Sequence, residues 1–486
     1  MASSDEIRKV RLEKLKILQD KGINAYPAKT DREYSLSEVK DKFDELAKKE
    51  VVILAGRVTA IRGQGGLIFF NINDGTAVLQ GLLKKDEMDA EVFDLFANTV
   101  DLGDFIEISG SLFITKRGEK TLKVVSWKML SKSLLPLPDK WDGLQDEEGR
   151  LRKRYLDILF NPEVKEMVEK RSKFWAATRD FLNQKGFMEV ETPVLENTTG
   201  GAEAKPFITH HNALDMEVYL RISPELWLKR LMVAGFPKVF EIGRIFRNEG
   251  MDAEHLQDYT MMECYQAYSD YEQGMKFVTE MYKYVAEKTF NTLKFKIKDF
   301  EIDLDNKWEI YDYSATIKKM TGIDIAKADL KTIEKKLKEL KVDYDNKNGF
   351  NLARGIDNLW KYCRKQIAGP GFLIGVPVMM EPLAKRMDKN PDLVERFQVI
   401  LAGSEMGKGF SELNDPLDQA ERFADQSKLR EAGDEEAQMN DTSFVEALEH
   451  GMPPTFGFGL SERLFSFLMN KPSRECQIFP LLKPKK

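Results

Sequence analysis

Residues 244–268 read RIFRNEGMDAEHLQDYTMMECYQAY, two strand-like runs around a polar centre. The first run begins at Val239 and the second carries Glu263 and Tyr265, which predicts an antiparallel hairpin. Glu263 and Tyr265 are two positions apart, so their side chains should face the same side. Together with Arg247, at the end of the first run, they suit a site that binds an anionic phosphate near a cationic group. A surface hairpin with solvated charges is the alternative, and these residues alone leave it open.

Composition limits the class of protein. The 486 residues allow two or three domains. A net charge of −6 argues against a protein that binds nucleic acid nonspecifically over its whole surface. Three scattered cysteines are too few for a disulfide scaffold or a paired-cysteine metal site, so a reducing, cytoplasmic location is expected. The N-terminus lacks a signal-peptide core and the apolar stretches are too short to cross a bilayer, so no membrane role is expected.

A cluster of basic side chains lies near the N-terminus, on a segment whose apolar residues recur at helical spacing. A solvated amphipathic helix is the favoured interpretation, and contact with nucleic acid is the alternative. The cluster consists of Arg8, Lys9, Arg11, Lys14 and Lys16.

Strand and turn signals divide the chain. Between 51 and 130, five short β-rich runs alternate with turns, which is typical of a small barrel such as the OB-fold, a binder of oligonucleotides. A stretch rich in proline, glycine and charge at 132–154 marks the domain boundary. The predicted divisions are a helical extension at 1–50, a barrel at 51–140, a linker at 141–155 and a second domain at 156–486 with a helical insertion around 305–365.

Several segments together resemble a known family. FRNEG followed by YTMMECYQAY is similar to the second signature motif of class II aminoacyl-tRNA synthetases. The stretch AKPFITHHNALDMEVYLRISPELWLKRL, from Ala204, resembles the lysyl-tRNA synthetase version. LLPLPDKW, GFMEVETPVL, PLAKR, GFSELNDPLDQAERF and GFGLSERL follow in that family's order, so the resemblance covers essentially the whole chain. It implies an α+β multidomain protein, with an OB-fold β-barrel and a catalytic domain whose mixed, mainly antiparallel sheet is flanked by helices.

The resemblance implies the activity of a lysine–tRNA ligase. Lysine would attack the α-phosphorus of ATP to give lysyl-adenylate, and the 3′-terminal hydroxyl of tRNA(Lys) would then take the lysyl group. Such a transfer needs no protein nucleophile, because in-line positioning and charge stabilisation by arginine and Mg²⁺ carry it. The implied partners are L-lysine, ATP and tRNA(Lys), and the implied assembly is a homodimer with an interface at 164–194.

The resemblance also assigns roles to residues of this sequence. The expected catalytic residues are Arg247, which would bridge the α-phosphate and the lysine carboxylate, and Arg463, which would lie against the γ-phosphate. The expected ATP-binding residues are Arg247, Glu249, His255, Tyr259, Glu405 and Arg463, with Tyr259 where a phenylalanine commonly stacks on adenine. A lysine ammonium needs buried anionic partners. The expected lysine-binding residues are Gly201, Glu225, Arg247, Glu263, Tyr265, Lys408, Phe410 and Glu412.

On the barrel, the resemblance matches Arg62, Phe69, Gln80 and Glu119 to positions that read the anticodon. Phe69 would stack on a base and the three polar residues would contact uridine edges. Phenylalanines in strands are usually core residues, so one of the adjacent pair Phe69 and Phe70 should point inward and the other outward.

Two positions near the expected metal site depart from the family pattern. Mg²⁺ would be held by Glu405 and by the residue seven positions earlier, which here is Gln398 instead of a carboxylate. An amide oxygen can ligate magnesium but brings no charge. Lys408 stands where an asparagine is usual. We expect its ammonium to face an anion, preferably the substrate carboxylate and otherwise an ATP phosphate or Glu405, unless the side chain extends to solvent.

The third signature motif, GFGLSERLFSFLMN, also departs from the pattern. Gly457 and Gly459 are expected to let the backbone approach a ligand, ahead of a helix that begins at Arg463. The usual third glycine is out of register, because the glycine loop ahead of the helix is one residue shorter than usual, and Glu462 replaces a common aspartate.

Two other functions compete with this interpretation. A related ligase that modifies a protein instead of tRNA would lack the barrel. A catalytically inactive relative that serves as an RNA-binding module would have lost its reactive residues. Arg247, Glu263, Glu405 and Arg463 argue against the second alternative, whereas Gln398 and the short glycine loop keep it open.

Overall fold

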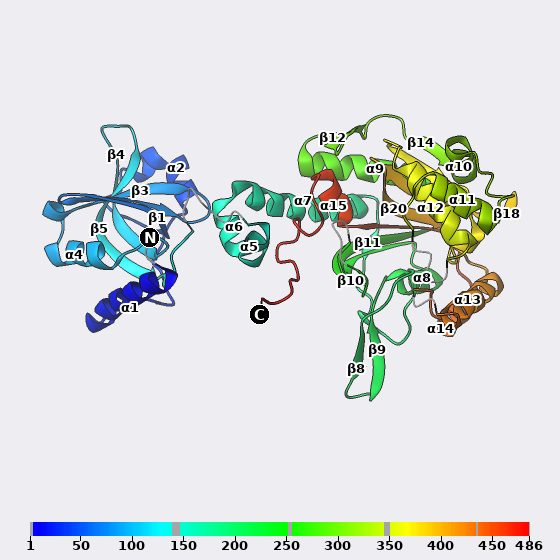
Figure 1. The fold of residues 1–486 in the computed structure, drawn as a ribbon. Helices are drawn as coiled ribbons and strands as arrows, with labels where there is room; N and C mark the ends of the chain where they lie inside the picture. The colour runs from blue at the N-terminus through cyan, green and yellow to red at the C-terminus, as the bar shows by residue number, and fades with distance from the viewer. Residues whose placement is uncertain (1–2, 139–145, 251–254, 345–349, 434–435, 486) are drawn as a thin grey trace. The chain divides into compact units, whose positions relative to one another are not determined.

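The computed structural model describes residues 3–138, 146–250, 255–344, 350–433 and 436–485. The chain divides into two units, residues 1–150 and 151–486 (Figure 1). Across the described ranges, no helix has the length and apolar character needed to span a membrane.

The first unit is built on a closed barrel with strand order β1-β2-β3-β5-β4. Buried and partly exposed residues alternate along its strands, and in β2 Ile68, Phe70 and Ile72 point into the core. Phe69, between them, points outward, as expected. The predicted OB-fold barrel is therefore confirmed. Its strands are β1 (Val52–Gln64), β2 (Leu67–Asn73), β3 (Val78–Lys84), β4 (Phe105–Ile114) and β5 (Lys120–Ser131).

The helices at the N-terminus share the core of the barrel, since Leu18, Val39 and Phe43 belong to its apolar cluster. Arg11 of the basic cluster is buried and donates hydrogen bonds to the carbonyls of Leu102, Ser133 and Leu135. The other members of the cluster are wholly or partly exposed. The helices are α1 (Ser4–Asp20), α2 (Leu36–Asp41), α3 (Phe43–Leu46), the 3₁₀ turn η1 (Lys85–Glu87) and α4 (Ala90–Thr99).

The second unit is organised by an eight-stranded sheet with the order β14-β15-β19-β20-β21-β11-β10-β6. Only the two outermost pairs, β14/β15 and β10/β6, are parallel, so the predicted mixed, mainly antiparallel sheet is confirmed. The strands are β6 (Met188–Glu189), β10 (Lys238–Phe246), β11 (Asp258–Ala267), β14 (Glu309–Asp312), β15 (Gly371–Ile374), β19 (Arg396–Leu401), β20 (Ser404–Ser411) and β21 (Thr455–Ser461).

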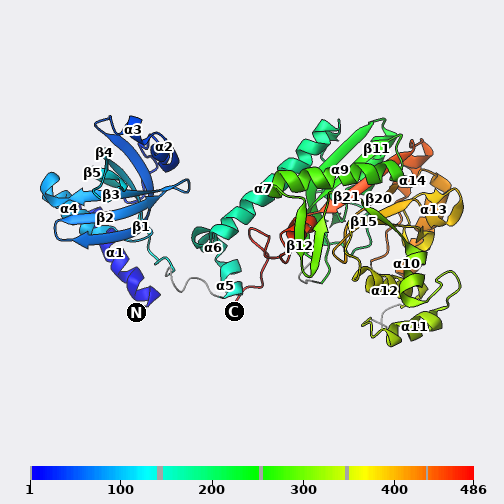
Figure 2. The ribbon, with the colours of Figure 1, turned by 90° about the horizontal axis from the view of Figure 1, so that it is seen from above.

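Two long helices, α7 (Pro162–Gln184) and α9 (Tyr271–Phe290), cover one face of this sheet (Figures 1 and 2). Proline is the first residue of α7, where its missing N–H costs nothing, and the Asp270 carboxylate caps α9. The helices pack on each other through Phe181 and Phe277, whose ring centroids are 5.3 Å apart. They also pack on Phe456, Phe458 and Leu460 of β21, so these side chains point to the face of the sheet that the two helices cover.

A second apolar core lies on the opposite face and includes side chains from the predicted insertion. That stretch contains α10 (Tyr313–Thr321), α11 (Leu330–Glu339) and α12 (Leu352–Arg364). It is not helical throughout, because β14 also lies in it and joins the edge of the sheet. The other helices on this core are α8 (Glu225–Val233), α13 (Pro416–Glu431) and α14 (Thr442–Glu449).

Smaller elements complete the second unit. Two helical segments, α5 (Glu147–Arg152) and α6 (Arg154–Phe160), precede α7, and α15 (Arg463–Leu468) follows the last strand. Three small sheets consist of β7 (Leu195–Glu196), β8 (Ile208–His211) and β9 (Met216–Leu220); β12 (Lys294–Ile297) and β13 (Phe300–Asp303); and β16 (Val376–Pro377), β17 (Arg386–Met387) and β18 (Asn390–Val394). The 3₁₀ turn η2 (Val378–Met380) follows β16.

Candidate functional site

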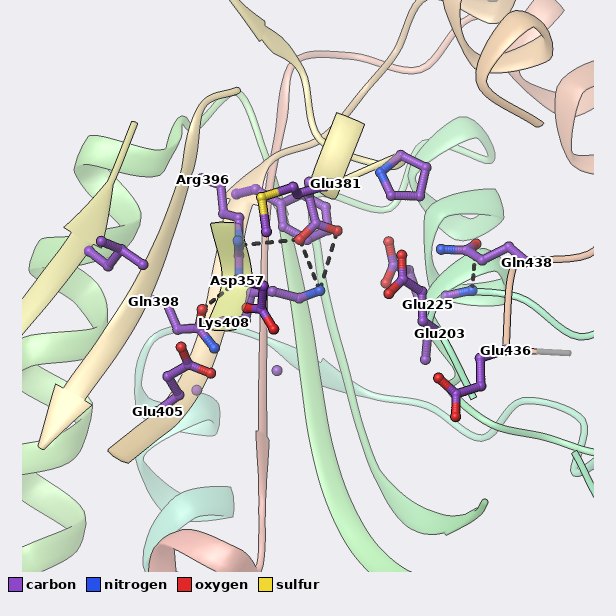
Figure 3. Close-up of a pocket in the computed structure, with 18 of the residues that line it drawn as sticks. Glu203, Glu225, Asp357, Glu381, Arg396, Gln398, Glu405, Lys408, Glu436 and Gln438 are labelled. Atoms are coloured by element: carbon purple, nitrogen blue, oxygen red, sulfur yellow. Dashed lines mark hydrogen bonds and ion pairs between the residues drawn. The ribbon is translucent and has the colours of Figure 1, made fainter. Parts of the chain in front are cut away.

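A cavity of about 700 Å³ opens over β19, β20, β21 and β11, and side chains of α8 and α12 contribute to its wall (Figure 3). Every residue predicted for the site in the second domain lines it, apart from Glu249 and His255. These two are exposed on either side of residues 251–254, which lie outside the described chain. The fold therefore brings the predicted residues of the hairpin, of β19 and β20 and of the third motif into one cavity.

The register of the strands arranges these residues in two rows across the sheet. In the first row, Gln398 of β19 pairs with Lys408 of β20, which pairs with Gly459 of β21, which pairs with Glu263 of β11. In this row the glycine leaves a gap between the ammonium of Lys408 and the carboxylate of Glu263. Because adjacent strands lie about 4.8 Å apart, the two side chains stand roughly 10 Å apart at their backbones.

The second row lies two residues away on the same face. Arg396 pairs with Phe410, Phe410 with Gly457 and Gly457 with Tyr265. Again a glycine of β21 separates large side chains on the two flanking strands. The two glycines together form the floor of a trough, with Lys408 and Phe410 on one side and the Glu263 and Tyr265 pair on the other.

The trough requires glycine at its floor for steric reasons. A Cβ on Gly457 would lie 1.9 Å from Oε1 of Glu412 and 2.6 Å from Cε1 of Tyr265. A Cβ on Gly459 would lie 2.8 Å from the terminal methyl of Met261. The expectation of a glycine loop ahead of the helix is wrong, because both glycines lie inside β21. Arg463, in contrast, begins α15 as predicted.

One end of the cavity is acidic and buried. Glu263 is 3 % exposed, and its carboxylate accepts hydrogen bonds from Ser223 Oγ at 2.6 Å and from the Tyr265 hydroxyl at 2.9 Å. Burial, together with the nearby charge of Glu225, raises the pKa of Glu263 to about 7. The hairpin prediction is confirmed in this respect, since Glu263 and Tyr265 share a face and touch each other.

A lysine that the sequence analysis did not single out lies behind this acidic end. The ammonium of Lys229, on α8, is fully buried and forms ion pairs with Glu225, at 2.7 Å, and with Glu412. Burial nevertheless raises the pKa of Glu412 well above its usual value. Lys229 forms ion pairs with two of the three buried carboxylates at this end, so the acidic end would gain from a further cation.

Arg247 and Tyr259 form another part of the wall. The guanidinium of Arg247 lies 5.6 Å from the centroid of the Tyr259 ring and donates hydrogen bonds of 3.3 Å to the carbonyl of Ile222. Nearby, the backbone N–H of Gly201 donates to Gln438 Oε1 at 3.3 Å. Gly201 has φ of +85°, and a Cβ there would lie 2.8 Å from Ser223 Oγ, so this close approach favours glycine.

The predicted metal residues lie at the far side of the trough (Figure 3). Glu405 accepts a hydrogen bond at Oε1 from Trp360 Nε1 at 2.7 Å, and Arg364 Nε lies 3.6 Å from the same oxygen. Arg463 donates to the backbone carbonyl of Glu405 at 3.2 Å. Gln398 Oε1 accepts from Arg396. Within the described ranges, no group of three His, Cys, Asp or Glu side chains is arranged to hold a metal ion.

The four predicted barrel residues lie on one surface of the first unit. Arg62 pairs with Phe69 across β1 and β2, and Asn71, two residues along β2, pairs with Gln80 of β3. Gln80 in turn pairs with Thr121 of β5 and accepts its hydroxyl hydrogen bond at 2.9 Å. Glu119, exposed, lies two residues before Thr121 in the turn that enters β5.

Comparison with known proteins places this geometry in a family. A model of class II tRNA synthetases for Asp, Lys and Asn matches residues 146–483, and a model of OB-fold nucleic acid binding domains matches residues 52–130. The chain belongs to the class II aminoacyl-tRNA synthetases. It is 43 % identical to a lysine–tRNA ligase of Thermotoga maritima, over 99 % of this chain and 97 % of the relative. It is 44 % identical to lysine–tRNA ligases of Pelotomaculum thermopropionicum and Carboxydothermus hydrogenoformans, over 99 % of this chain and 96 % and 99 % of theirs.

In this class II synthetase, Lys408 has a partner that the sequence analysis did not identify. Its Nζ lies 3.0 and 3.2 Å from the two carboxylate oxygens of Glu381, and Nε of Arg396 lies 3.2 Å from the same group (Figure 3). Lys408 forms its ion pair with Glu381 and not with Glu405, one of the anions expected there. The side chain does not simply extend to solvent either, because its charged end is held in this ion pair.

Sequence signals for the missed residues of this synthetase differ in strength. Lys229 follows Glu225 by four positions, a spacing that puts the two on one face of a helix such as α8. Trp360, on the last helix of the insertion, carried no such signal because its contact with Glu405 spans 45 residues. Glu381 directly precedes the PLAKR segment, but it lies 27 residues from Lys408 in the chain, so no local pattern pairs the two.

Proposed function

We infer that this synthetase is a lysine–tRNA ligase. It activates L-lysine with ATP to lysyl-adenylate and transfers the lysyl group to the 3′ end of tRNA(Lys), with release of AMP and pyrophosphate. The observation that carries the inference is the buried acidic end of a cavity that also contains Arg247 and Arg463. A desolvated ammonium without anionic partners costs several kcal/mol, so such a pocket selects a cationic amino acid over a neutral one.

The lysine side chain fits along the trough. Its ammonium would meet Glu263, Tyr265 and Glu412, and its apolar stem would lie beside the Phe410 ring. Glu225 and the backbone at Gly201, which adjoin at the start of α8, would hold the α-amino group. In this arrangement the ammonium of the substrate side chain joins Lys229 as a further cation at the acidic end.

The ATP phosphates would lie toward the arginines. Arg247, which lines the cavity beside Tyr259, would bridge the α-phosphate and the lysine carboxylate and stabilise the charge that builds up as the carboxylate attacks. Tyr259 would stack on adenine, and Arg463, at the start of α15, would contact the γ-phosphate. Glu249 and His255 do not line the cavity, so both side chains would have to move to reach the nucleotide.

Two oxygen donors on the far side, from Glu405 and Gln398, would hold magnesium. Trp360 and Arg364 occupy Oε1 of Glu405, which leaves Oε2 as the metal ligand, and the amide of Gln398 would add a neutral oxygen. When bound, Mg²⁺ would neutralise phosphate charge and hold the pyrophosphate leaving group. With one carboxylate and several nearby cations, this site would bind the metal weakly.

For the rest of the reaction we propose that tRNA(Lys) binds the barrel through Arg62, Phe69, Gln80 and Glu119. We also propose that two copies of the chain associate through residues 164–194 and that the enzyme works in the cytoplasm. The three cysteines, Cys264, Cys363 and Cys476, are free and buried, which suits a reducing compartment.

The proposed function is tested by exchange of labelled pyrophosphate into ATP. We expect exchange that depends on L-lysine and that aspartate and asparagine do not support. Charging of tRNA(Lys) by the same preparation then tests the second step. No exchange with lysine would support the catalytically inactive alternative instead.

Phe69→Ala separates the barrel from the catalytic domain. We expect charging of tRNA to weaken by about 1 to 3 kcal/mol in kcat/KM, because a base loses its stacking platform. Lysine-dependent pyrophosphate exchange should stay at the level of the unmodified enzyme. A matched loss in both assays would mean that Phe69 supports the fold and does not contact tRNA.

Lysine affinity should depend on pH through Glu263. The pKa of Glu263 is raised to about 7 in the empty pocket, so below pH 7 this carboxyl carries a proton there. The substrate ammonium favours the ionised form, and binding must then release that proton. The affinity for lysine should therefore fall as the pH drops from 8 to 6. Below the pKa of Glu263, the loss of affinity should approach about tenfold per pH unit. Calorimetry in two buffers of different ionisation heat should detect the released proton; equal heats at pH 6.5 would contradict the idea.

A further inference from the structure

Glu381 is a buried carboxylate that holds two cations at the wall of the cavity. It is 4 % exposed and pairs with Lys408 and Arg396. Burial alone would raise the pKa of Glu381, but the two cations hold it below its usual value. Glu381 is therefore charged at neutral pH and neutralises positive charge inside the site.

The Glu381 backbone is fixed, whereas Lys408 has room to move. Arg422 of α13 donates hydrogen bonds to the carbonyls of Glu381, at 3.2 Å, and Ala384, at 2.7 Å, and is itself held by Asp418. The side chain of Lys408 is 41 % exposed and long enough to change partners. Between the two members of the pair, the lysine is the one that can turn to a ligand.

Lys408 stands between the two regions that would hold the substrates. Lys408 and Phe410 of β20, and Glu412 just past its end, line the cavity at every second position. The centroid of the Phe410 ring lies 5.8 Å from Lys408 Nζ and 5.3 Å from Lys229 Nζ. Across the sheet Lys408 pairs with Gln398, on the side of Glu405. The Lys408 ammonium therefore lies within roughly one Debye length of both the acidic end of the cavity and the side where the ATP phosphates would bind.

We propose that the Glu381–Lys408 ion pair sets the balance of affinity between the two substrates. Glu381 competes with the ATP phosphates for Lys408 and shields the lysine ammonium from its charge. When ATP binds, Lys408 turns to a phosphate while Glu381 stays paired with Arg396. This proposal rests on the proposed function, because it takes ATP and L-lysine as the two ligands.

The proposal predicts opposite shifts in two affinities. In Glu381→Gln, Lys408 is no longer held by an ion pair, so ATP should bind about three- to tenfold more tightly. L-lysine should bind about three- to tenfold more weakly, because the Lys408 charge is no longer shielded. Both factors are those expected for one charge at the distance between Lys408 and the ligand. In Lys408→Asn, ATP should bind more weakly by a similar factor. The double variant should return both affinities close to those of the unmodified enzyme.

Calorimetric titration with ATP in EDTA, and separately with L-lysine, measures these affinities without catalysis. Asp101→Asn is the matched control, because Asp101 also pairs with two lysines, Lys14 and Lys132, but belongs to the first unit and does not line the cavity. It should change neither affinity, and melting temperatures should show that all variants are folded.

Parallel weakening of both ligands in Glu381→Gln, or no change in either, would overturn the proposal and leave the pair a structural one. Opposite shifts in an enzyme that shows no lysine-dependent pyrophosphate exchange would keep the proposal and reject the proposed function. The two failures are thus distinguishable.

Discussion

Glu412→Gln should raise the KM for lysine by roughly ten- to more than a hundredfold, with little change in the KM for ATP. Glu412 is 1 % exposed and lies at the acidic end of the trough, beside Tyr265 and over Gly457. Removing its charge takes away a partner of the substrate ammonium, and a hydrogen bond to a charged group contributes about 1.5 to 3 kcal/mol. Steady-state pyrophosphate exchange with each substrate varied in turn measures both constants.

The same substitution also removes a partner of Lys229, which could destabilise the fold by leaving a buried cation less neutralised. Tyr265→Phe therefore provides a second variant, since it deletes only a hydroxyl and leaves the Lys229 ion pairs intact. It should raise the KM for lysine in the same direction by a smaller factor. If both variants are folded and keep the lysine KM of the unmodified enzyme, the ammonium does not bind at this end.

Gly457→Ala should abolish most lysine activation while the protein remains folded. The added Cβ would lie 1.9 Å from a carboxylate oxygen of Glu412 and 2.6 Å from the Tyr265 ring, so both side chains must leave the floor of the trough. Overpacking of this kind costs typically about 1 to 3 kcal/mol, and here it falls on the groups that would hold the substrate. Calorimetry with L-lysine and the thermal midpoint, measured together, separate lost binding from lost stability.

Gly459→Ala is the matched comparison, because Gly459 lies two residues further along the same strand. Its Cβ would meet the terminal methyl of Met261 at 2.8 Å, the end of a flexible side chain that can turn away. We expect a clearly smaller loss of lysine affinity than in Gly457→Ala. Equal losses, or a larger loss at Gly459, would mean that the trough does not hold the lysine side chain in the proposed direction.

The local part of the site could be predicted because it depends on short-range periodicity. Two strand-like runs around a polar loop predicted the hairpin, and the period of two placed Glu263 and Tyr265 on one face. The barrel was predictable for the same reason, since five short β-rich runs with turn signals between them indicate the strands of a small barrel. The glycines of the third motif were misplaced, because Gly-x-Gly before a helix reads as a turn when the neighbouring strands are unknown.

The sequence by itself determined the family, the two-part organisation and the residue types of the site. Only the tertiary structure decided which distant charges meet: Lys229 with Glu412, and Lys408 with Glu381 rather than Glu405. These two pairs join segments far apart in the chain, and their partners are chosen by sheet register and by the packing of α8 and α13 on the sheet. Local patterns record the period of a strand or helix, but the position of one strand against the next follows from the packing of the whole core.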